Sequence, residues 1–144
     1  MPHPTGDQRP RIAVFGAGSI GCYLGGHLAQ HADVTLIGRP SVLDGLHDGM
    51  TLSGGGRPAV HVTRDRLKLS TEPDAVADAD CVLVTVKSAA TVSAGRELAG
   101  RLRRDAVVVS FQNGLHNARL LRDELPGGRR SWSGPELLHA LRRP

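Results

Sequence analysis

Short apolar runs alternate along the chain with longer segments in which apolar residues recur every three or four positions. Short apolar or β-branched runs are typical of strands buried in a sheet, and the three-to-four spacing is typical of helices with one buried face. The runs predict strands at residues 12–15, 34–37, 66–69, 81–86 and 106–111. The periodic segments predict helices at residues 19–31, 41–46, 73–77, 89–102 and 115–125. This alternation predicts an α/β domain with a doubly wound, mostly parallel sheet.

A different pattern separates the second predicted strand from the third. Two short alternating runs, Met50–Leu52 and Ala59–Val62, flank three consecutive glycines at 54–56. Alternation on both sides of a glycine turn predicts a β-hairpin.

The first predicted helix contains both an apolar ridge and several glycines. Ile20, Leu24 and Leu28 recur every four residues and predict the ridge. A glycine inside a helix costs roughly 1 kcal/mol relative to alanine. That cost indicates that Gly21 and Gly25 lie against the sheet, where a side chain would hold the helix away.

The sequence GAGSIG, which we call the glycine loop, lies between the first predicted strand and the first predicted helix. It comprises Gly16, Ala17, Gly18, Ser19, Ile20 and Gly21. A strand before it, a helix after it and a second strand ending at Gly38 make the βαβ unit that binds dinucleotides. The first glycine permits the tight turn, the second lets the backbone approach a pyrophosphate, and the third lets the helix pack closely. The phosphates would lie on free N–H groups at the positive end of the helix. The alternative is a glycine-rich turn in an unrelated α/β domain.

The residue after the second strand indicates which dinucleotide would bind. NAD-specific domains place an Asp or Glu there to accept a hydrogen bond from the ribose 2′-hydroxyl, whereas a 2′-phosphate requires a cation. Here the residue is Arg39, and the next carboxylate along the chain is Asp44. A guanidinium can bind a phosphate through two hydrogen bonds. Arg39 therefore predicts NADP(H) as the cofactor; the alternative is an exposed arginine that merely ends a strand.

Two further residues follow predicted strands and would lie at the same edge of the sheet. Lys87 follows the strand at 81–86, and Asn113 follows the strand at 106–111. Ligands of open α/β sheets bind beyond the carboxyl ends of the strands. Lys87 could place its ammonium over cofactor phosphates or a substrate carboxylate, and Asn113 could bind ribose or substrate oxygens. The alternatives are a snorkelling lysine and an asparagine that suits a turn.

Length and composition indicate one soluble globular domain. The chain has 144 residues, of which 40% are hydrophobic and 22% charged. Its polar, proline-containing start resembles no signal peptide, and no apolar stretch is long enough to span a membrane. We therefore expect a cytoplasmic protein without membrane contact. The formal net charge of +4 comes with only 3% aromatic residues and no basic stripe. This composition argues against nucleic-acid binding and suits an anionic nucleotide.

The cysteines and two of the histidines suggest no further chemistry. Cys22 and Cys81 lie 59 positions apart, which predicts buried, reduced thiols rather than a disulfide or metal cluster. His27 and His31 have a spacing that can bind a metal on a helix. No third ligand is apparent, so we interpret both as part of a solvated helix face and predict no metal site.

These observations divide the chain into three predicted segments. Residues 1–10 are expected to be disordered, and residues 11–125 form the cofactor-binding domain. Residues 126–144 are expected to form an irregular basic tail, because they are rich in arginine and glycine, contain the single Trp132 and show no strand-like run.

Four segments resemble a known family. The glycine loop with Arg39, the stretch Gly49–Ala59, the sequence VLVTVKSAAT at 82–91 and the sequence SFQNGLHN at 110–117 are similar to the N-terminal domain of ketopantoate reductases. The resemblance implies a Rossmann NAD(P)-binding fold and NADPH-dependent reduction of 2-dehydropantoate to (R)-pantoate, a step toward pantothenate and coenzyme A. It implies phosphate binding by the glycine loop and a 2′-phosphate contact for Arg39. Lys87 and Asn113 would line the cleft for cofactor and 2-oxo acid substrate.

The resemblance covers residues 11–125. In the family a second, helical domain follows and supplies a lysine general acid and a substrate-binding glutamate. The only lysines here are Lys68 and Lys87, and neither lies in such a domain. A general acid typically contributes roughly 10²–10⁴-fold to the rate. We therefore expect poor or absent reductase activity from this chain alone.

Several alternatives follow from that difference. A frameshift or early stop near Gly127 could have replaced the second domain, or another chain could complete the protein. The uncovered apolar surface would favour self-association or marginal stability. The chain could also be a non-catalytic module that binds or senses NADP(H), or part of a reductase for a different 2-oxo acid.

Overall fold

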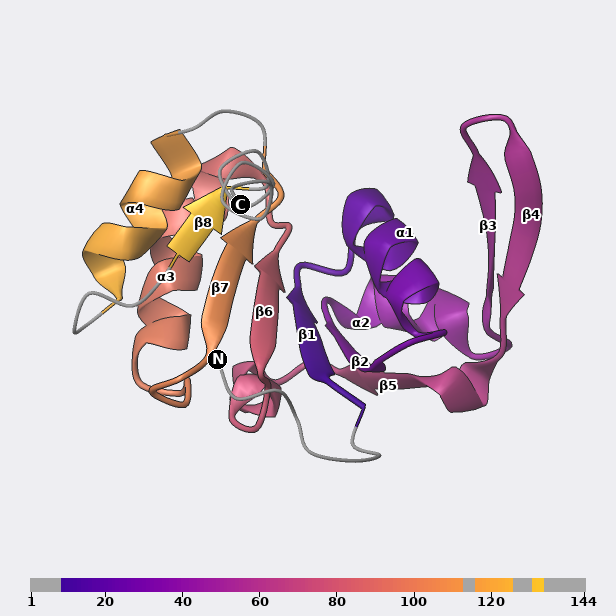
Figure 1. Ribbon diagram of the computed structural model, residues 1–144, viewed down its shortest axis with the longest axis horizontal. Coiled ribbons are helices and arrows are strands. Elements are labelled where there is room, and N and C mark those ends of the chain that lie inside the picture. The colour runs from indigo at the N-terminus through magenta and orange to yellow at the C-terminus, as the bar shows by residue number, and fades with distance from the viewer. Residues whose placement is uncertain (1–8, 113–115, 126–130, 134–144) are drawn as a thin grey trace, which may run out of the picture.

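The computed structural model describes residues 9–112, 116–125 and 131–133. Its centre is a six-stranded sheet with the order β5-β2-β1-β6-β7-β8 (Figure 1). All neighbouring strands in this sheet pair in parallel. The strands are β1 (Arg11–Phe15), β2 (Asp33–Ile37), β5 (Leu67–Ser70), β6 (Cys81–Val84), β7 (Val107–Ser110) and β8 (Ser131–Ser133). The predicted doubly wound parallel sheet is confirmed.

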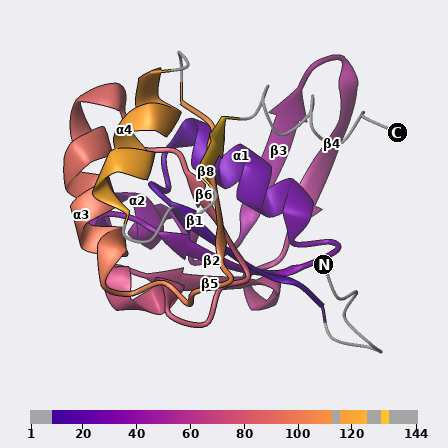
Figure 2. The same cartoon turned by 60° about the vertical axis from the view of Figure 1, so that its left-hand side comes forward.

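Helices cover both faces of the sheet (Figures 1 and 2). One face carries α1 (Ser19–Leu28), and the other carries α3 (Thr91–Ala99) and α4 (His116–Glu124). A short α2 (Pro40–Leu43) follows β2. Four 3-10 segments complete the connections, at Asp44–Leu46, Arg64–Arg66, Pro73–Val76 and Ser88–Ala90. Each predicted helix is present as helix or 3-10 turn, generally shorter than predicted, because the sequence pattern does not show where the hydrogen-bonded turns begin and end.

The hydrophobic core lies in two layers, one on each face of the sheet. Alternate strand residues point to opposite faces, so Val14 and Leu36 pack on the α1 side while Val82 and Val108 pack under α3 and α4. Leu98 and Leu121, from α3 and α4, are fully buried in the second layer. The strands are therefore apolar on both sides, as the sequence indicated.

The predicted hairpin is present and stands apart from the main sheet (Figure 1). It consists of β3 (Met50–Gly54) and β4 (Arg57–Val62), which pair antiparallel. Gly26 of α1 lies against this hairpin, because a Cβ built there would be 2.7 Å from Leu52 Cδ1. The hairpin thus packs on the helix rather than on a strand.

Three glycines are the fully buried residues of α1, and of the predicted apolar ridge Leu24 and Leu28 pack partly buried against the core. Ile20 is 54% exposed, which corrects the prediction that it belongs to a core-facing ridge. The buried residues are Gly21, Gly25 and Gly26. A Cβ at Gly25 would lie 2.6 Å from Leu36 Cδ2. The expectation that Gly21 and Gly25 lie against the sheet is confirmed, and this close approach turns Ile20 toward solvent.

The predicted irregular tail contains a strand. Ser131–Ser133 form β8, which pairs with β7 through Val109 and Trp132 among other residues. The prediction that residues 126–144 contain no strand is therefore wrong for 131–133. The strand forms because β7 presents unpaired backbone groups at its edge, a long-range partner that no local apolar run reveals. The predictions for residues 1–8 and for the rest of the tail lie outside the described residues.

Candidate nucleotide-binding site

The glycine loop is held tightly between the ends of β2 and β6. The N–H groups of Gly16 and Ala17 both donate to Ile37 O, at 3.0 and 2.9 Å, and Gly18 N–H donates to Gly16 O at 2.8 Å. Gly16 has φ +114°, and a Cβ there would lie 2.7 Å from Val86 N. Both the conformation and the lack of space require glycine at this position. Gly16 and Ala17 thus shape the loop while their own amides are already bound.

The start of α1 leaves amides available for an anion. Gly18 is the N-cap, with φ −89° and ψ −162°, and it has no side chain with which to cap the helix. A Cβ at Gly18 would meet no atom within 4 Å among the described residues. The first N–H groups of a helix have no intrahelical acceptor, and here they belong to Ser19, Ile20 and Gly21. An anion could therefore approach the helix start closely, where the helix dipole favours it.

Thr85, a residue that the sequence analysis missed, joins β6 to the glycine loop. Its hydroxyl donates to Gly16 O at 2.6 Å and lies 3.3 Å from Phe15 O. The same oxygen would be 2.8 Å from a Cβ at Gly21. The available signal was a hydroxyl residue inside an otherwise apolar run, two positions before Lys87.

Arg39 lies beside the glycine loop at the end of β2. A Cβ at Gly38 would be 2.7 Å from Ala17 Cβ, so the chain leaving β2 passes directly by the loop. Arg39 is exposed and is the N-cap of α2, where Pro40 occupies the first helical position. In the part of the chain that the structure describes, no ion pair includes Arg39. The Arg39 side chain is therefore accessible from solvent at the point where the chain passes the loop.

Lys87 lies at the same edge of the sheet as the glycine loop. It follows β6 and is the exposed N-cap of the 3-10 segment Ser88–Ala90. Asn113 lies outside the described residues, but Gln112 before it is held by hydrogen bonds to Val86 O at 2.9 Å and Thr91 Oγ1 at 2.7 Å. The structure therefore brings Lys87 and the residue preceding Asn113 to one edge.

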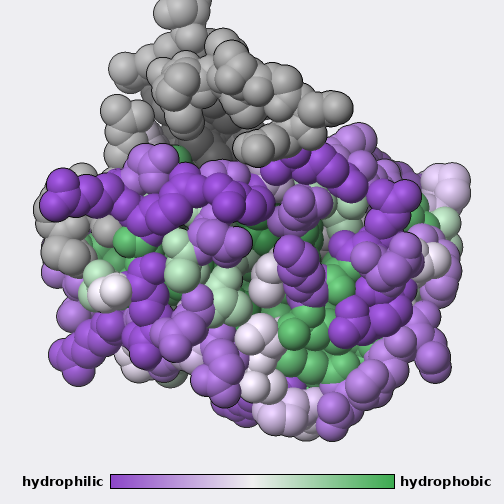
Figure 3. Space-filling view, turned by 90° about the horizontal axis from the view of Figure 1, so that it is seen from below, coloured by the Kyte–Doolittle hydropathy of each residue, from purple (hydrophilic) through white to green (hydrophobic). Residues whose placement is uncertain are grey.

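The opposite, amino-terminal edge of the sheet is occupied by a charged cluster. Asp80 accepts a hydrogen bond from the backbone N–H of Arg11 at 2.8 Å and pairs with Arg103 at 2.9 Å. Arg103 also pairs with Asp105. Figure 3 shows this underside as mostly hydrophilic, with an apolar area between the charged groups. The charged groups there already have partners within the protein.

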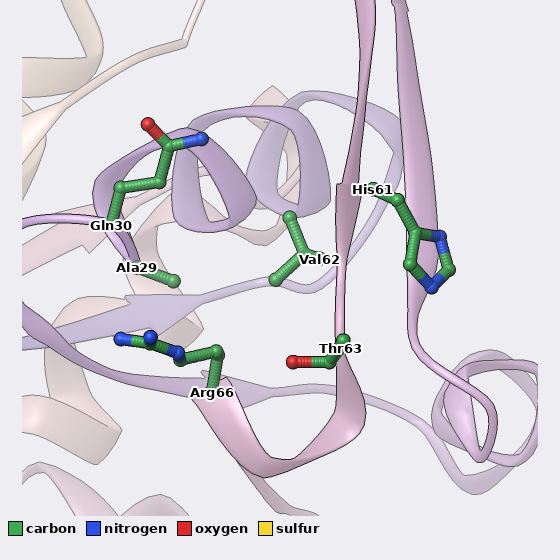
Figure 4. Close-up of a pocket in the computed structure, with 6 residues that line it drawn as sticks. All are labelled: Ala29, Gln30, His61, Val62, Thr63 and Arg66. Carbon is green, nitrogen blue, oxygen red and sulfur yellow. The ribbon is translucent and has the colours of Figure 1, made fainter.

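A cavity of about 310 Å³ lies at the far end of α1 from the glycine loop (Figure 4). It is lined by Ala29, Gln30, His61, Val62, Thr63 and Arg66. Ala29 and Val62 are buried and the polar residues are exposed. Because it shares no residue with the glycine loop, Arg39 or Lys87, it is separate from the predicted site.

The two cysteines are free thiols. Cys22 lies in the first turns of α1 and donates to Ala17 O at 3.7 Å. Burial raises the pKa of Cys22 and raises that of Cys81 to about 11. Both are therefore protonated near neutral pH.

Within the described residues, no three His, Cys, Asp or Glu side chains are grouped to hold a metal ion. None of the helices described is both long and apolar enough to cross a membrane.

A parallel sheet with a glycine loop at its carboxyl edge defines a Rossmann-like domain. The family model described as ketopantoate reductase PanE/ApbA matches residues 12–137, a span that includes β8. A 2-dehydropantoate 2-reductase of Halobacterium salinarum is 40% identical over 119 residues, covering 81% of this chain and 38% of that protein. A glycerol-3-phosphate dehydrogenase [NAD(P)+] of Rhizobium johnstonii is 36% identical, covering 74% of this chain and 33% of that protein.

Solved structures agree. The PanE/ApbA family ketopantoate reductase of Ralstonia eutropha has a TM-score of 0.74 and 36% identity, covering 84% of this chain and 39% of that chain. Lactate dehydrogenase of Eimeria maxima, solved with NADH and oxamate, shares the fold with a TM-score of 0.58 and 17% identity, over 84% of this chain and 42% of that one. The chain belongs to the ketopantoate reductase family and spans less than half the length of these relatives. Its family and neighbours imply binding of a nicotinamide dinucleotide.

Proposed function

We propose that this chain is the NADP(H)-binding part of a cytoplasmic reductase that converts 2-dehydropantoate to (R)-pantoate. The observation that carries the proposal is the position of Arg39, exposed at the end of β2 next to the glycine loop. A cation there suits the 2′-phosphate that distinguishes NADP(H) from NAD(H). The match to a 2-dehydropantoate 2-reductase over most of this chain supports the substrate.

Each part of the site has a distinct role in the proposal. The amides at the start of α1 bind the pyrophosphate, and Gly18 lets it approach. Arg39 binds the 2′-phosphate. Lys87 and Asn113 orient the remaining part of the cofactor and the 2-oxo acid. Bound NADPH would supply the hydride that reduces the ketone.

A second candidate is a reductase for a different small oxo compound. The glycerol-3-phosphate dehydrogenase of Rhizobium johnstonii matches much of this chain, so closely related cofactor domains occur in proteins named for different substrates. The other alternative, a non-catalytic NADP(H)-binding module, uses the same residues.

Titration of NADPH and NADH into the purified chain, followed by cofactor fluorescence, tests the cofactor proposal. Arg39→Ala should weaken NADPH binding by about ten- to a hundredfold, the value of a charge-assisted hydrogen bond, and NADH binding by less than about threefold. Arg57→Ala, which removes an exposed arginine from the hairpin, serves as the matched control. Equal losses for both cofactors would contradict the role of Arg39.

Turnover then distinguishes the two substrate proposals. NADPH oxidation that depends on 2-dehydropantoate supports the first proposal, and oxidation only with other 2-oxo compounds supports the second. Tight NADPH binding without turnover is expected both of a cofactor domain measured without its substrate domain and of a binding module, since the chain covers 38% of the matched reductase.

The proposal includes self-association through apolar residues at the site edge. Ile20, in the first turn of α1, is 54% exposed, and Phe111, which directly follows β7, is 37% exposed. Light scattering across a range of protein concentrations should show association. A monomer at all concentrations would argue against it.

A further inference from the structure

A chain of polar side chains connects the ends of β6 and β7 to the starts of α3 and α4. Ser110 Oγ donates to Gln112 Oε1 at 2.9 Å, and Gln112 Nε2 donates to Thr91 Oγ1 at 2.7 Å. Thr91 Oγ1 donates in turn to Asn117 Oδ1 at 2.9 Å. Asn117 Nδ2 donates to Ser88 Oγ at 3.0 Å. The residues come from three separate segments of the chain, 88–91, 110–112 and the start of α4, and form one continuous network.

Most of this network is removed from solvent. Thr91 is 0% exposed, Ser110 2% and Asn117 5%. When a buried polar group loses its hydrogen-bond partner, the loss of stability is larger than the net contribution of the hydrogen bond itself. The Thr91 hydroxyl accepts from Gln112 and donates to Asn117, so it joins the two halves of the network. One arrangement of these side chains is strongly favoured over others.

The network holds the residues on both sides of Lys87, through the backbone of Val86 and the side chain of Ser88. Gln112 Nε2 also donates to Val86 O at 2.9 Å, and Asn117 binds the hydroxyl of Ser88. Val86 and Ser88 are the immediate neighbours of Lys87 in the chain. Gln112 is likewise the immediate neighbour of Asn113. Thus the same hydrogen bonds fix the residues on both sides of Lys87.

The exposed Lys87 side chain has four rotatable bonds, and in the described residues no ion pair includes it. Its direction toward a ligand therefore depends on the backbone from which it extends. A displacement of about 1 Å in a positioning group can cost roughly a hundredfold in function. A buried hydrogen-bond network beside Lys87 would hold its backbone in one position and so place the side chain accurately.

We propose that Thr91, acting with Gln112 and Asn117, is a positioning residue that fixes the residues on both sides of Lys87 and so sets the point from which the Lys87 side chain extends. Through Lys87 it orients the part of the cofactor beyond the adenosine. This inference rests on the proposed cofactor site and assigns a role to residues outside it. Thr91 itself touches no ligand in this proposal.

Two substitutions at one position test the role. Thr91→Val keeps the shape and removes the hydroxyl, and Thr91→Ser keeps the hydroxyl and removes a methyl group. Each variant is titrated with NADPH and with adenosine 2′,5′-bisphosphate, which carries only the adenosine half with its 2′-phosphate. The second ligand reports the glycine loop and Arg39, and so also shows that the variant is folded.

Thr91→Val should weaken NADPH binding by about tenfold while binding of adenosine 2′,5′-bisphosphate stays within about twofold. Thr91→Ser should restore NADPH binding to within about threefold of the natural chain. Ser93→Ala is the matched control, because it removes a hydroxyl from the same helix that bonds only to Ala90 O in the described contacts. It should change neither affinity.

A double substitution tests whether Thr91 acts through Lys87. Thr91→Val should weaken NADPH binding less in a Lys87→Ala background than in the natural chain, because the group it positions is gone. Equal effects in both backgrounds would overturn the proposal. Parallel losses for both ligands in Thr91→Val, or unchanged affinity for both, would also overturn it. Failure of the natural chain to bind either ligand would instead refute the proposed function.

Discussion

The hydroxyl of Thr85 donates a 2.6 Å hydrogen bond to the carbonyl oxygen of Gly16. This contact joins the end of β6 to the loop after β1, across 69 positions of sequence. The hydroxyl oxygen of Thr85 also lies 2.8 Å from the position that a Cβ at Gly21 would occupy, so the two would collide. The loop, the helix start and the strand end that leads to Lys87 are therefore positioned together rather than separately.

Two glycines of the loop should respond differently to alanine. In Gly21→Ala the new Cβ would meet the backbone oxygen of Gly16, which cannot move as a flexible side chain can. Overpacking of this kind typically costs about 1–3 kcal/mol. We expect the free energy of unfolding, measured by urea denaturation, to fall by that amount and NADPH binding to be lost with it.

Gly18→Ala is the companion variant. The described residues leave open space around a Cβ there, and its φ of −89° suits alanine. The free energy of unfolding should change by less than about 0.5 kcal/mol, while NADPH affinity falls about tenfold because the phosphate cannot approach. An unchanged affinity would show that no phosphate lies against Gly18.

Removal of the Thr85 hydroxyl should loosen the loop. Thr85→Val retains the side-chain shape but leaves Gly16 O without this donor, which should cost about 1 kcal/mol of unfolding free energy. NADPH affinity should fall as well, since the loop is less well held. Thr85→Ser keeps the donor and should lie close to the natural chain in both measurements. A Thr85→Ser variant as weak as Thr85→Val would assign the effect to packing instead.

Local patterns were sufficient for most of the fold and for the glycine loop. The apolar runs and the spacing of the glycines each reflect contacts within one βαβ unit, so a short window of sequence contains the information. β8 was missed because its stability depends on pairing with β7, far away in the chain. The exposure of Ile20 was not predicted, because helical periodicity shows which residues share a face. It does not show which of them the glycines bring against the sheet.

In the candidate site, too, contacts between residues far apart in the chain could not be predicted from local patterns. Arg39 and Lys87 could be identified because each directly follows a strand, and parallel strands end at one edge of a sheet. Thr85, Thr91 and Asn117 could not, because their partners lie 21 to 70 positions away. Their hydroxyl and amide groups are informative only once the strands are in register.

Asp80 should make stability depend on pH. The backbone N–H of Arg11, followed by the guanidinium of Arg103, holds the pKa of Asp80 below its ordinary value. The unfolded chain therefore binds the proton more readily than the folded one, so this contribution is full above about pH 5. It is lost as the pH falls through the lowered pKa of the folded state.

Asp80→Asn should accordingly lower the unfolding free energy by about 1 kcal/mol at pH 7, a modest value because the side chain is 39% exposed. The difference from the natural chain should shrink below about pH 4. Asp48→Asn, an exposed aspartate in a turn, is the control and should show little effect at either pH. A difference that stays constant between pH 7 and pH 3 would rule out the charge of Asp80 as its cause.

Cys81 should be a poorly reactive thiol in the folded protein. Burial, followed by the nearby charge of Asp80, raises its pKa from 9.0 to about 11. The thiolate is the reactive form, and this rise lowers its fraction at pH 8 by about a hundredfold. In a Cys22→Ser background, which leaves Cys81 as the single thiol, reaction with a disulfide reagent at pH 8 should be at least that much slower in the folded protein than in urea. The reverse background, Cys81→Ser, measures Cys22, whose pKa is also raised by burial. A rate for Cys81 in the folded protein within about threefold of its rate in urea would contradict this prediction. It would mean that the start of β6 opens to solvent despite the ion pairs of Asp80 with Arg11 and Arg103.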